Sequence, residues 1–134
     1  MFTFKKSIPM LSILATLTIA SAAYAANDAI NLAYQDAKAT GSLVTDFSVF
    51  ENDKANARTD WQNNQTWQYL VVGVTLKSAE NISAAYEIHG SDYGNWAHVS
   101  ASKGGVWAFQ SDHKILDRYN TATVRTIESL TSRW

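Results

Sequence analysis

The sequence predicts a mainly β protein, a small antiparallel sandwich of six or seven short strands preceded by a short N-terminal helix. Three alternating runs between residues 82 and 111 carry this prediction. The turn signals at 90–94 and at Gly104-Gly105 separate them, as in a β-meander. Further alternating runs recur at intervals of about 8–12 residues, which is typical of sandwiches. The alternative is an α+β fold, with the helix packed on an antiparallel sheet.

The N-terminus has the three parts of a secretory signal peptide. Lysines stand at positions 5 and 6, a mostly apolar run follows over 8–20, and Ala23-Tyr24-Ala25 matches an A-x-A cleavage site. The apolar run is too short to serve as a membrane span. We therefore expect a signal peptide over 1–25 and a single β-rich domain over 26–134. The lysine-led signal is typical of bacteria, so a secreted or periplasmic protein is expected.

Charge and cysteine content narrow the class of partner. Eleven Lys and Arg residues stand against twelve Asp and Glu residues, and loss of the two signal lysines would make the mature chain more acidic. This balance disfavours nucleic acid and anionic membranes as partners. Because the chain has no cysteine, the domain is disulfide-free and its stability must come from packing. No later run is apolar for long enough to span a bilayer, so stable membrane insertion is not expected.

A short helix is predicted directly after the cleavage site. Asn27 or Asp28 can cap it, and apolar residues then follow from Ile30 to Ala37 at the spacing of one helix face. Gly41 stands where a glycine would end the helix. The stripe is rich in alanine, so we expect the helix to dock on a sheet.

The middle of the chain predicts two strands and one long loop. Residues 42–50 alternate as a half-buried strand does. The polar stretch 51–65 has Trp61 as its only large apolar residue, and we expect a loop in which Trp61 is at least half exposed. Residues 66–77 form the strongest strand, and their apolar side chains on both faces indicate a central strand covered on each side.

Counting through the two turn signals assigns the faces of the meander. The glycine pair is expected to close a two-residue hairpin and residues 90–94 a five-residue hairpin. The large side chains then gather on one buried face: Ile82, Ala84, Tyr86, Ile88, Trp96, His98, Trp107 and Phe109. After the meander, residues 112–114 are expected to form a turn and residues 121–130 a last strand.

No pattern in the sequence predicts catalysis, a metal site or a cofactor. In the predicted fold His89 lies near one turn, His98 on the aromatic face and His113 in another turn, so the three do not converge. The histidine and cysteine spacings of zinc sites are absent, and no serine stands in a G-x-S-x-G motif. We therefore expect a protein that is not an enzyme and that holds no metal or cofactor.

Aromatic residues in the predicted loops are the candidate binding groups. Exposed aromatic side chains anchor protein interfaces and provide stacking platforms for sugars, although capping a small core is their commoner use. The candidates, with the polar residues beside them, are Trp61, Trp67, Arg58, Asp60, Asn63 and Tyr93.

Three hypotheses of function follow. The first is an exported, non-enzymatic recognition domain that binds another protein or a surface polymer through loop aromatics and an open sheet edge. Such an edge would also allow a homodimer. The second is a small-ligand or carbohydrate-binding module that uses Trp61 and Trp67 with the polar groups of the long loop. The third, a secreted membrane-active toxin, is disfavoured by the acidic charge and by the lack of a cationic amphipathic segment.

Overall fold

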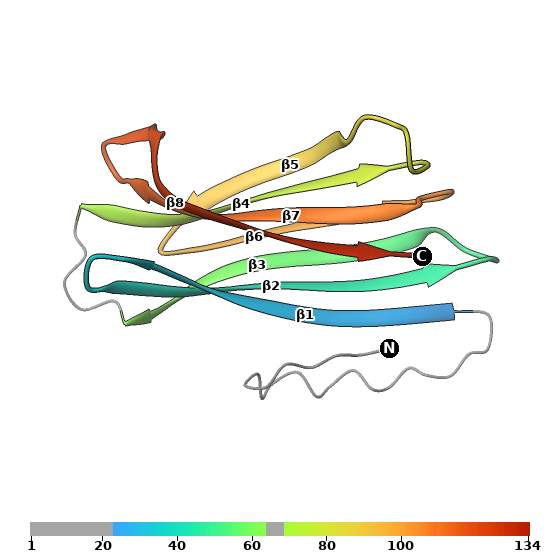
Figure 1. Cartoon of the computed structure of the whole chain (residues 1–134), viewed down its shortest axis with the longest axis horizontal. Helices are drawn as coiled ribbons and strands as arrows, with labels where there is room; N and C mark the ends of the chain where they lie inside the picture. Colours follow the sequence, from blue (N-terminus) through green and yellow to red (C-terminus); the bar gives the residue numbers. More distant parts are fainter. Residues whose placement is uncertain (1–22, 64–68) are drawn as a thin grey trace.

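In the computed structural model, residues 23–63 and 69–134 are described, and they form eight β-strands in two antiparallel sheets (Figure 1). Sheet A has the strand order β1-β2-β3-β6 and sheet B has the order β5-β4-β7-β8. The strands are β1 Ala23–Tyr34, β2 Ala37–Ser48, β3 Asp53–Asn63, β4 Leu70–Ala79, β5 Glu87–Gly94, β6 Trp96–Lys103, β7 Ala108–Asp117 and β8 Asn120–Arg133. This arrangement confirms the mainly β fold with two antiparallel sheets, but the described residues form eight strands where six or seven short ones were expected.

Most of the expected signal peptide lies outside the described residues, because the description begins at Ala23. The expected cleavage site falls inside β1, where Ala25 is paired with Asp46 of β2. Within the described part of the chain, no helix is long and apolar enough to cross a membrane.

The expected N-terminal helix is wrong, because its residues belong to β1 and to the turn into β2. β1 pairs with β2 from Ala23 to Tyr34, and Gln35 takes a φ of 56° in the tight turn that follows. Ile30 and Tyr34 pack against the core, whereas Ala33, which belonged to the expected helix stripe, is exposed. Apolar and polar residues in this segment also alternate with the two-residue period of a strand, and pairing with β2 stabilises the strand.

The expected loop over 51–65 is wrong as well, since most of it is β3, an inner strand of sheet A. Its long polar side chains face solvent, and the residues between them, most of them small, face the core. Alternation was hard to see because alanine and threonine occupy the inward positions, where large apolar side chains usually mark a strand. The inward residues are Asp53, Ala55, Ala57, Thr59 and Trp61.

The expected strands over 42–50 and 66–77 correspond to β2 and β4. In β2, Leu43 and Phe47 are buried as expected, and Phe47 lies 5.6 Å from Phe109 of sheet B between ring centroids. β4 is central in its sheet, between β5 and β7, and every residue from 70 to 76 is buried. Both strands are confirmed over their described parts, since residues 66–68 lie outside the described residues and β4 begins at Leu70; large apolar side chains mark both strands.

The two expected hairpins of the meander are wrong. β5 runs through residues 90–94 and pairs with β4 of sheet B, whereas β6 pairs with β3 of sheet A. The glycine pair at 104–105 then carries the chain from β6 back to β7 of sheet B, with Gly105 at a φ of 70°. The chain therefore crosses between sheets both at Asn95 and at 104–107, and β5 and β6, the edge strands of opposite sheets, contact each other.

Because the chain crosses between the sheets, the predicted buried face is wrong. Phe109 is buried, but five of the large side chains expected beside it are exposed. Trp107 is half-buried. The exposed residues are Ile82, Tyr86, Ile88, Trp96 and His98.

The C-terminal part of the chain is a long hairpin of β7 and β8. The expected strand over 121–130 is confirmed, since it lies within β8. The expected turn at 112–114 is wrong, because these residues stand in the middle of β7, paired with β4 on one side and with β8 on the other. His113 points into the core from this position and is fully buried.

Candidate functional site

The strand pair β3 and β6 carries a row of polar side chains on the solvent side of sheet A. Because side chains alternate along a strand, the inward alanines of β3 leave the residues between them facing outward. The register of the two strands places each outward residue of β3 opposite an outward residue of β6. We call this row the β3–β6 face, and it consists of Asn56, Arg58, Asp60, Trp96, His98 and Ser100.

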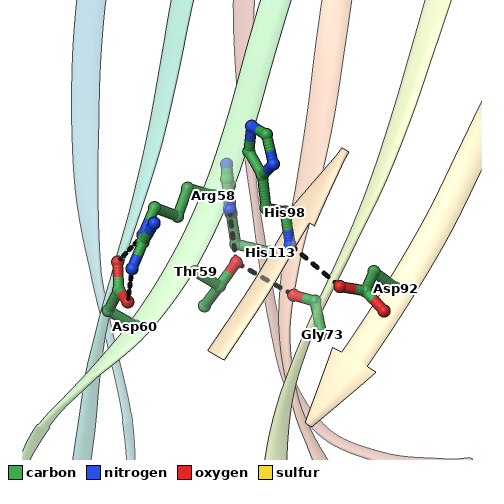
Figure 2. Close-up of polar contacts among 7 residues, drawn as sticks. All are labelled: Arg58, Thr59, Asp60, Gly73, Asp92, His98 and His113. Atoms are coloured by element: carbon green, nitrogen blue, oxygen red, sulfur yellow. Dashed lines mark hydrogen bonds and ion pairs between the residues drawn. The ribbon is translucent and has the colours of Figure 1, made fainter. Parts of the chain in front are cut away.

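Arg58, Asp60 and Trp96 form one half of the β3–β6 face. The Nε and Nη2 groups of Arg58 donate hydrogen bonds to the two carboxylate oxygens of Asp60, at 2.6 and 3.0 Å (Figure 2). The guanidinium carbon lies 4.9 Å from the ring centroid of Trp96, a cation–π contact. Hydrogen bonding to Asp60 raises the pKa of Arg58. The indole is 54% exposed beside this fixed ion pair.

His98, Asn56 and Ser100 form the other half. Ser100 Oγ donates a hydrogen bond to Asn56 Oδ1 at 2.6 Å, and His98 Nε2 lies 3.3 Å from both of these oxygens. The backbone N–H of His98 donates to the carboxylate of Asp92 at 3.1 Å (Figure 2). Asp92 belongs to β5, so the edge of sheet B supports this part of the face. The side chains are exposed, yet bonded to one another.

The polar surface continues onto β2 and β1. Gln62, the next outward residue of β3, donates hydrogen bonds to Asn31 Oδ1 at 3.0 Å and to Thr40 Oγ1 at 2.5 Å. Charges on this side of sheet A nearly balance, because three basic residues on outward positions stand against two acidic ones. The basic residues are Lys38, Lys54 and Arg58, and the acidic residues are Asp46 and Asp60.

The structure divides the predicted binding residues among different places. Arg58 and Asp60 lie together on the β3–β6 face, although on a strand and not in the expected loop. Trp61 points the other way and is partly buried against the core, so the expected exposure of at least half is wrong.

The remaining predicted residues do not join the β3–β6 face. Asn63 holds the end of the β2–β3 hairpin, since its side chain accepts from Lys38 N and donates to Asp36 O, both at 3.1 Å. Tyr93 is 58% exposed on the outer side of sheet B, opposite Gly73. Trp67 lies outside the described residues.

Sequence reasoning missed Trp96, Asn56 and Ser100 as site residues. Trp96 and His98 were placed on a buried face because β6 was counted from a hairpin that does not exist. A usable signal was present, since β6 alternates exposed residues with the inward Ala97 and Val99. Small apolar residues at every second position mark the inward side of β6 as they do in β3.

A separate polar cluster is buried between the sheets around His113. Thr59 Oγ1 donates to the carbonyl of Gly73 at 3.0 Å and lies 2.8 Å from His113 Nδ1 (Figure 2). A threonine hydroxyl carries one proton, so this oxygen must accept a hydrogen bond from an Nδ1–H of the ring. Ser111 Oγ, at 2.7 Å, then donates to the unprotonated Nε2.

This arrangement holds His113 as a neutral imidazole with both nitrogens bonded. Burial lowers the pKa of His113 to about 4, because the charged ring would lose its hydration, and the nearby Asp112 offsets this only in part. A ring that is buried and fully bonded has no nitrogen to offer a substrate. His113 is therefore a structural group that joins the two sheets.

His89 is engaged separately, with Nε2 lying 2.6 Å from Ser78 Oγ. Among residues 23–63 and 69–134 no three His, Cys, Asp or Glu side chains are grouped so that they could hold a metal ion. The β3–β6 face brings together guanidinium, carboxylate, indole, imidazole, amide and hydroxyl groups. In comparisons with protein-family models, with curated proteins and with solved structures, the chain has no match.

Proposed function

We propose that this protein is an exported, non-enzymatic recognition domain that binds its partner through the β3–β6 face. The observation that carries the proposal is the exposed Trp96, held beside the bidentate pair of Arg58 and Asp60. Tryptophan and arginine are the residue types most enriched where truncation removes binding energy. Export is supported by the signal-peptide pattern of residues 1–25.

The mutual hydrogen bonds of the face favour binding. Immobilising a free side chain at an interface costs about 0.5–1.5 kcal/mol each. On the β3–β6 face Arg58 is already fixed by Asp60, and Ser100 by Asn56. A partner would therefore meet side chains that have already lost much of their rotamer freedom.

The same geometry favours binding over catalysis. Ser100 and His98 are neighbours, but Ser100 gives its proton to Asn56 at 2.6 Å, while the His98 nitrogen is 3.3 Å away. The ring contacts of His98 are to Asn56 and Ser100, and the carboxylate of Asp92 accepts from its backbone. A nucleophile needs a base that is itself oriented, in a site that excludes water. An open sheet face with this bonding pattern suits recognition.

The test compares binding of labelled protein to native cell-envelope and medium fractions. A double variant, Arg58→Ala with Trp96→Ala, removes the centre of the face. A matched control, Ile88→Ala with Tyr93→Ala, removes two exposed residues from sheet B. We expect the first variant to lose at least about tenfold in affinity, since hot-spot truncation costs ~2 kcal/mol or more, and the control to bind as wild type. Equal binding by all three folded proteins would refute the proposal.

A further inference from the structure

We infer that the ligand of the β3–β6 face is a neutral polysaccharide, with a sugar ring stacked on Trp96 and its hydroxyl groups bonded to Asn56 and Ser100. This inference rests on the proposed function, because it names the ligand class of the same face. Four properties of the face support it: its shape, its mixture of side chains, its charge and its unused hydrogen-bonding groups.

The shape of the face suits a polymer. β3 and β6 are paired from Asp53–Lys103 to Asp60–Trp96 without a bulge. At about 3.3 Å per residue, this regular ladder is roughly 25 Å long, and the β3–β6 face from Asn56 to Asp60 takes up about 13 Å of it. A regular ladder of this length can contact several successive units of an extended chain.

The mixture of side chains matches a sugar better than a protein. A pyranose ring presents apolar C–H groups on its faces and hydroxyl groups around its rim. The face has one large apolar group, the indole of Trp96 with Arg58 over its ring, then the Arg58–Asp60 pair, and amide, hydroxyl and imidazole groups along the rest of the row. The core of a protein interface usually gathers several apolar and aromatic side chains.

The charge of the face favours a neutral ligand. Arg58 is matched by Asp60 in a bidentate pair, and Lys54 lies 3.9 Å from the carboxylate of Glu51. An anionic polymer is usually held by several cations that are not already neutralised. Neutral hydroxyl groups need hydrogen-bonding partners instead, and the face supplies these at fixed positions.

The hydrogen bonds within the face leave both a donor and an acceptor group available to a ligand. Asn56 accepts through Oδ1, and within the described chain none of its bonds uses the amide nitrogen, which is a donor. Ser100 donates its proton to Asn56, so its oxygen can accept from a ligand. A sugar hydroxyl both donates and accepts, and neighbouring hydroxyls could therefore bond to both residues.

Affinity electrophoresis through gels containing one soluble polysaccharide each tests the inference. The probes are a β-glucan, an α-glucan and a galactomannan, which are neutral, and polygalacturonate, which is anionic. We expect at least one neutral polymer to retard the protein, equally at low and high salt. Trp96→Ala should raise the apparent Kd at least tenfold. Trp96→Tyr should retain part of the binding, since it keeps an aromatic platform.

Two further variants complete the design. Asn56→Ala with Ser100→Ala should raise the apparent Kd several-fold, because it removes the hydrogen-bonding groups and leaves the indole. Tyr93→Ala is the matched control, since Tyr93 has nearly the same exposure as Trp96 but lies on sheet B, and it should migrate as wild type. Circular dichroism checks that each variant is folded.

Other outcomes overturn the inference in distinguishable ways. If no neutral polymer retards the protein while binding to envelope proteins still depends on Trp96, the ligand is a protein and the proposed face stands. Retardation by polygalacturonate alone, abolished by salt, would identify an anionic ligand. If Trp96→Ala changes no binding of any kind, both the inference and the proposed function fail.

Discussion

At the scale of single residues, Gly41 and His113 form one unit that sets how closely the sheets approach. A Cβ atom on Gly41 would overlap the imidazole ring of His113 in the opposite sheet. Hydrogen bonds with Thr59 and Ser111 keep that ring in place. Glycine is therefore required here for close packing, and its resemblance to a helix terminator in the sequence was misleading.

The buried imidazole makes stability depend on pH. His113 has a pKa of about 4 in the folded protein, against an ordinary value near 6.5 in the unfolded chain. Between these values the unfolded chain binds the proton more tightly. The free energy of unfolding should therefore be greatest above pH 6.5 and should fall as pH drops toward 4, by roughly 3 kcal/mol.

Urea unfolding at pH 7.5, 5.5 and 4 measures this dependence. His113→Gln removes the titrating group while keeping an amide for Thr59 or Ser111, so its stability should change less over the same interval. Burial alone would raise the pKa of Asp112, but hydrogen bonds with Lys77 and Ser129 outweigh it, so the pKa is lowered. Asp112 therefore affects stability only below about pH 4. A wild-type stability that is flat from pH 7.5 to 4 would contradict the assigned state of His113.

At the scale of elements, the inward alanines of β3 decide where the β3–β6 face lies. Ala55 and Ala57 are buried, and Ala57 is paired with Val99 of β6. Small inward residues let the strand lie close to sheet B. All of the long polar side chains of β3 are then directed to solvent, where they form the site.

Enlarging one inward alanine tests this role of β3. Ala57→Leu inserts three carbon atoms at a position with no exposed surface, and overpacking of this kind typically costs about 1–3 kcal/mol. Ser102→Leu adds a similar volume on the outward side of β6 and should change stability by no more than about 0.5 kcal/mol. Thermal and urea unfolding compare the two variants. Equal stabilities would show that β3 does not pack inward as described.

How well each element could be predicted depended on the size of its inward side chains. Leu43 and Phe47 in β2, and the apolar run of β4, made those strands visible in the sequence. β3 was hidden because its inward residues are small, and β1 was mistaken for a helix because its alanines fit both periods. Secondary-structure propensity and hydrophobic periodicity are local properties of the sequence, and they do not show which strand pairs with which.

The candidate site was predicted only in part for the same reason. Arg58 and Asp60 were named from their composition, but their alignment on one strand face follows from β3 being a strand. Trp96 was expected to be buried because residues 90–94, which belong to β5, were taken to close a hairpin. A turn that crosses between sheets and a turn that closes a hairpin use similar residues, so the sequence does not distinguish the two. A crossing changes which side of the next strand faces the core.

At the scale of the whole molecule, the two sheets are joined by contacts between residues far apart in the sequence. Phe47 meets Phe109, Thr45 Oγ1 lies 2.7 Å from Ser132 Oγ, and Thr126 Oγ1 donates to the carbonyl of Ala33 at 3.1 Å. These contacts run along the β1 and β8 side as well as through the core. We therefore expect the two sheets to unfold together, in one cooperative transition.

This organisation predicts that the domain folds without residues 1–25. After their removal β1 keeps its pairs with β2 from Ala26–Thr45 to Tyr34–Ala37 and its hydrogen bond from Thr126 of β8 to Ala33. The 26–134 protein should therefore unfold cooperatively, and its Tm should be the same with and without reductant, because the chain has no cysteine. Calorimetry of this protein, and the mass of the exported natural protein, test both parts. A truncated chain that is unfolded, or an exported protein whose mass includes the first 25 residues, would show that these residues belong to the mature domain.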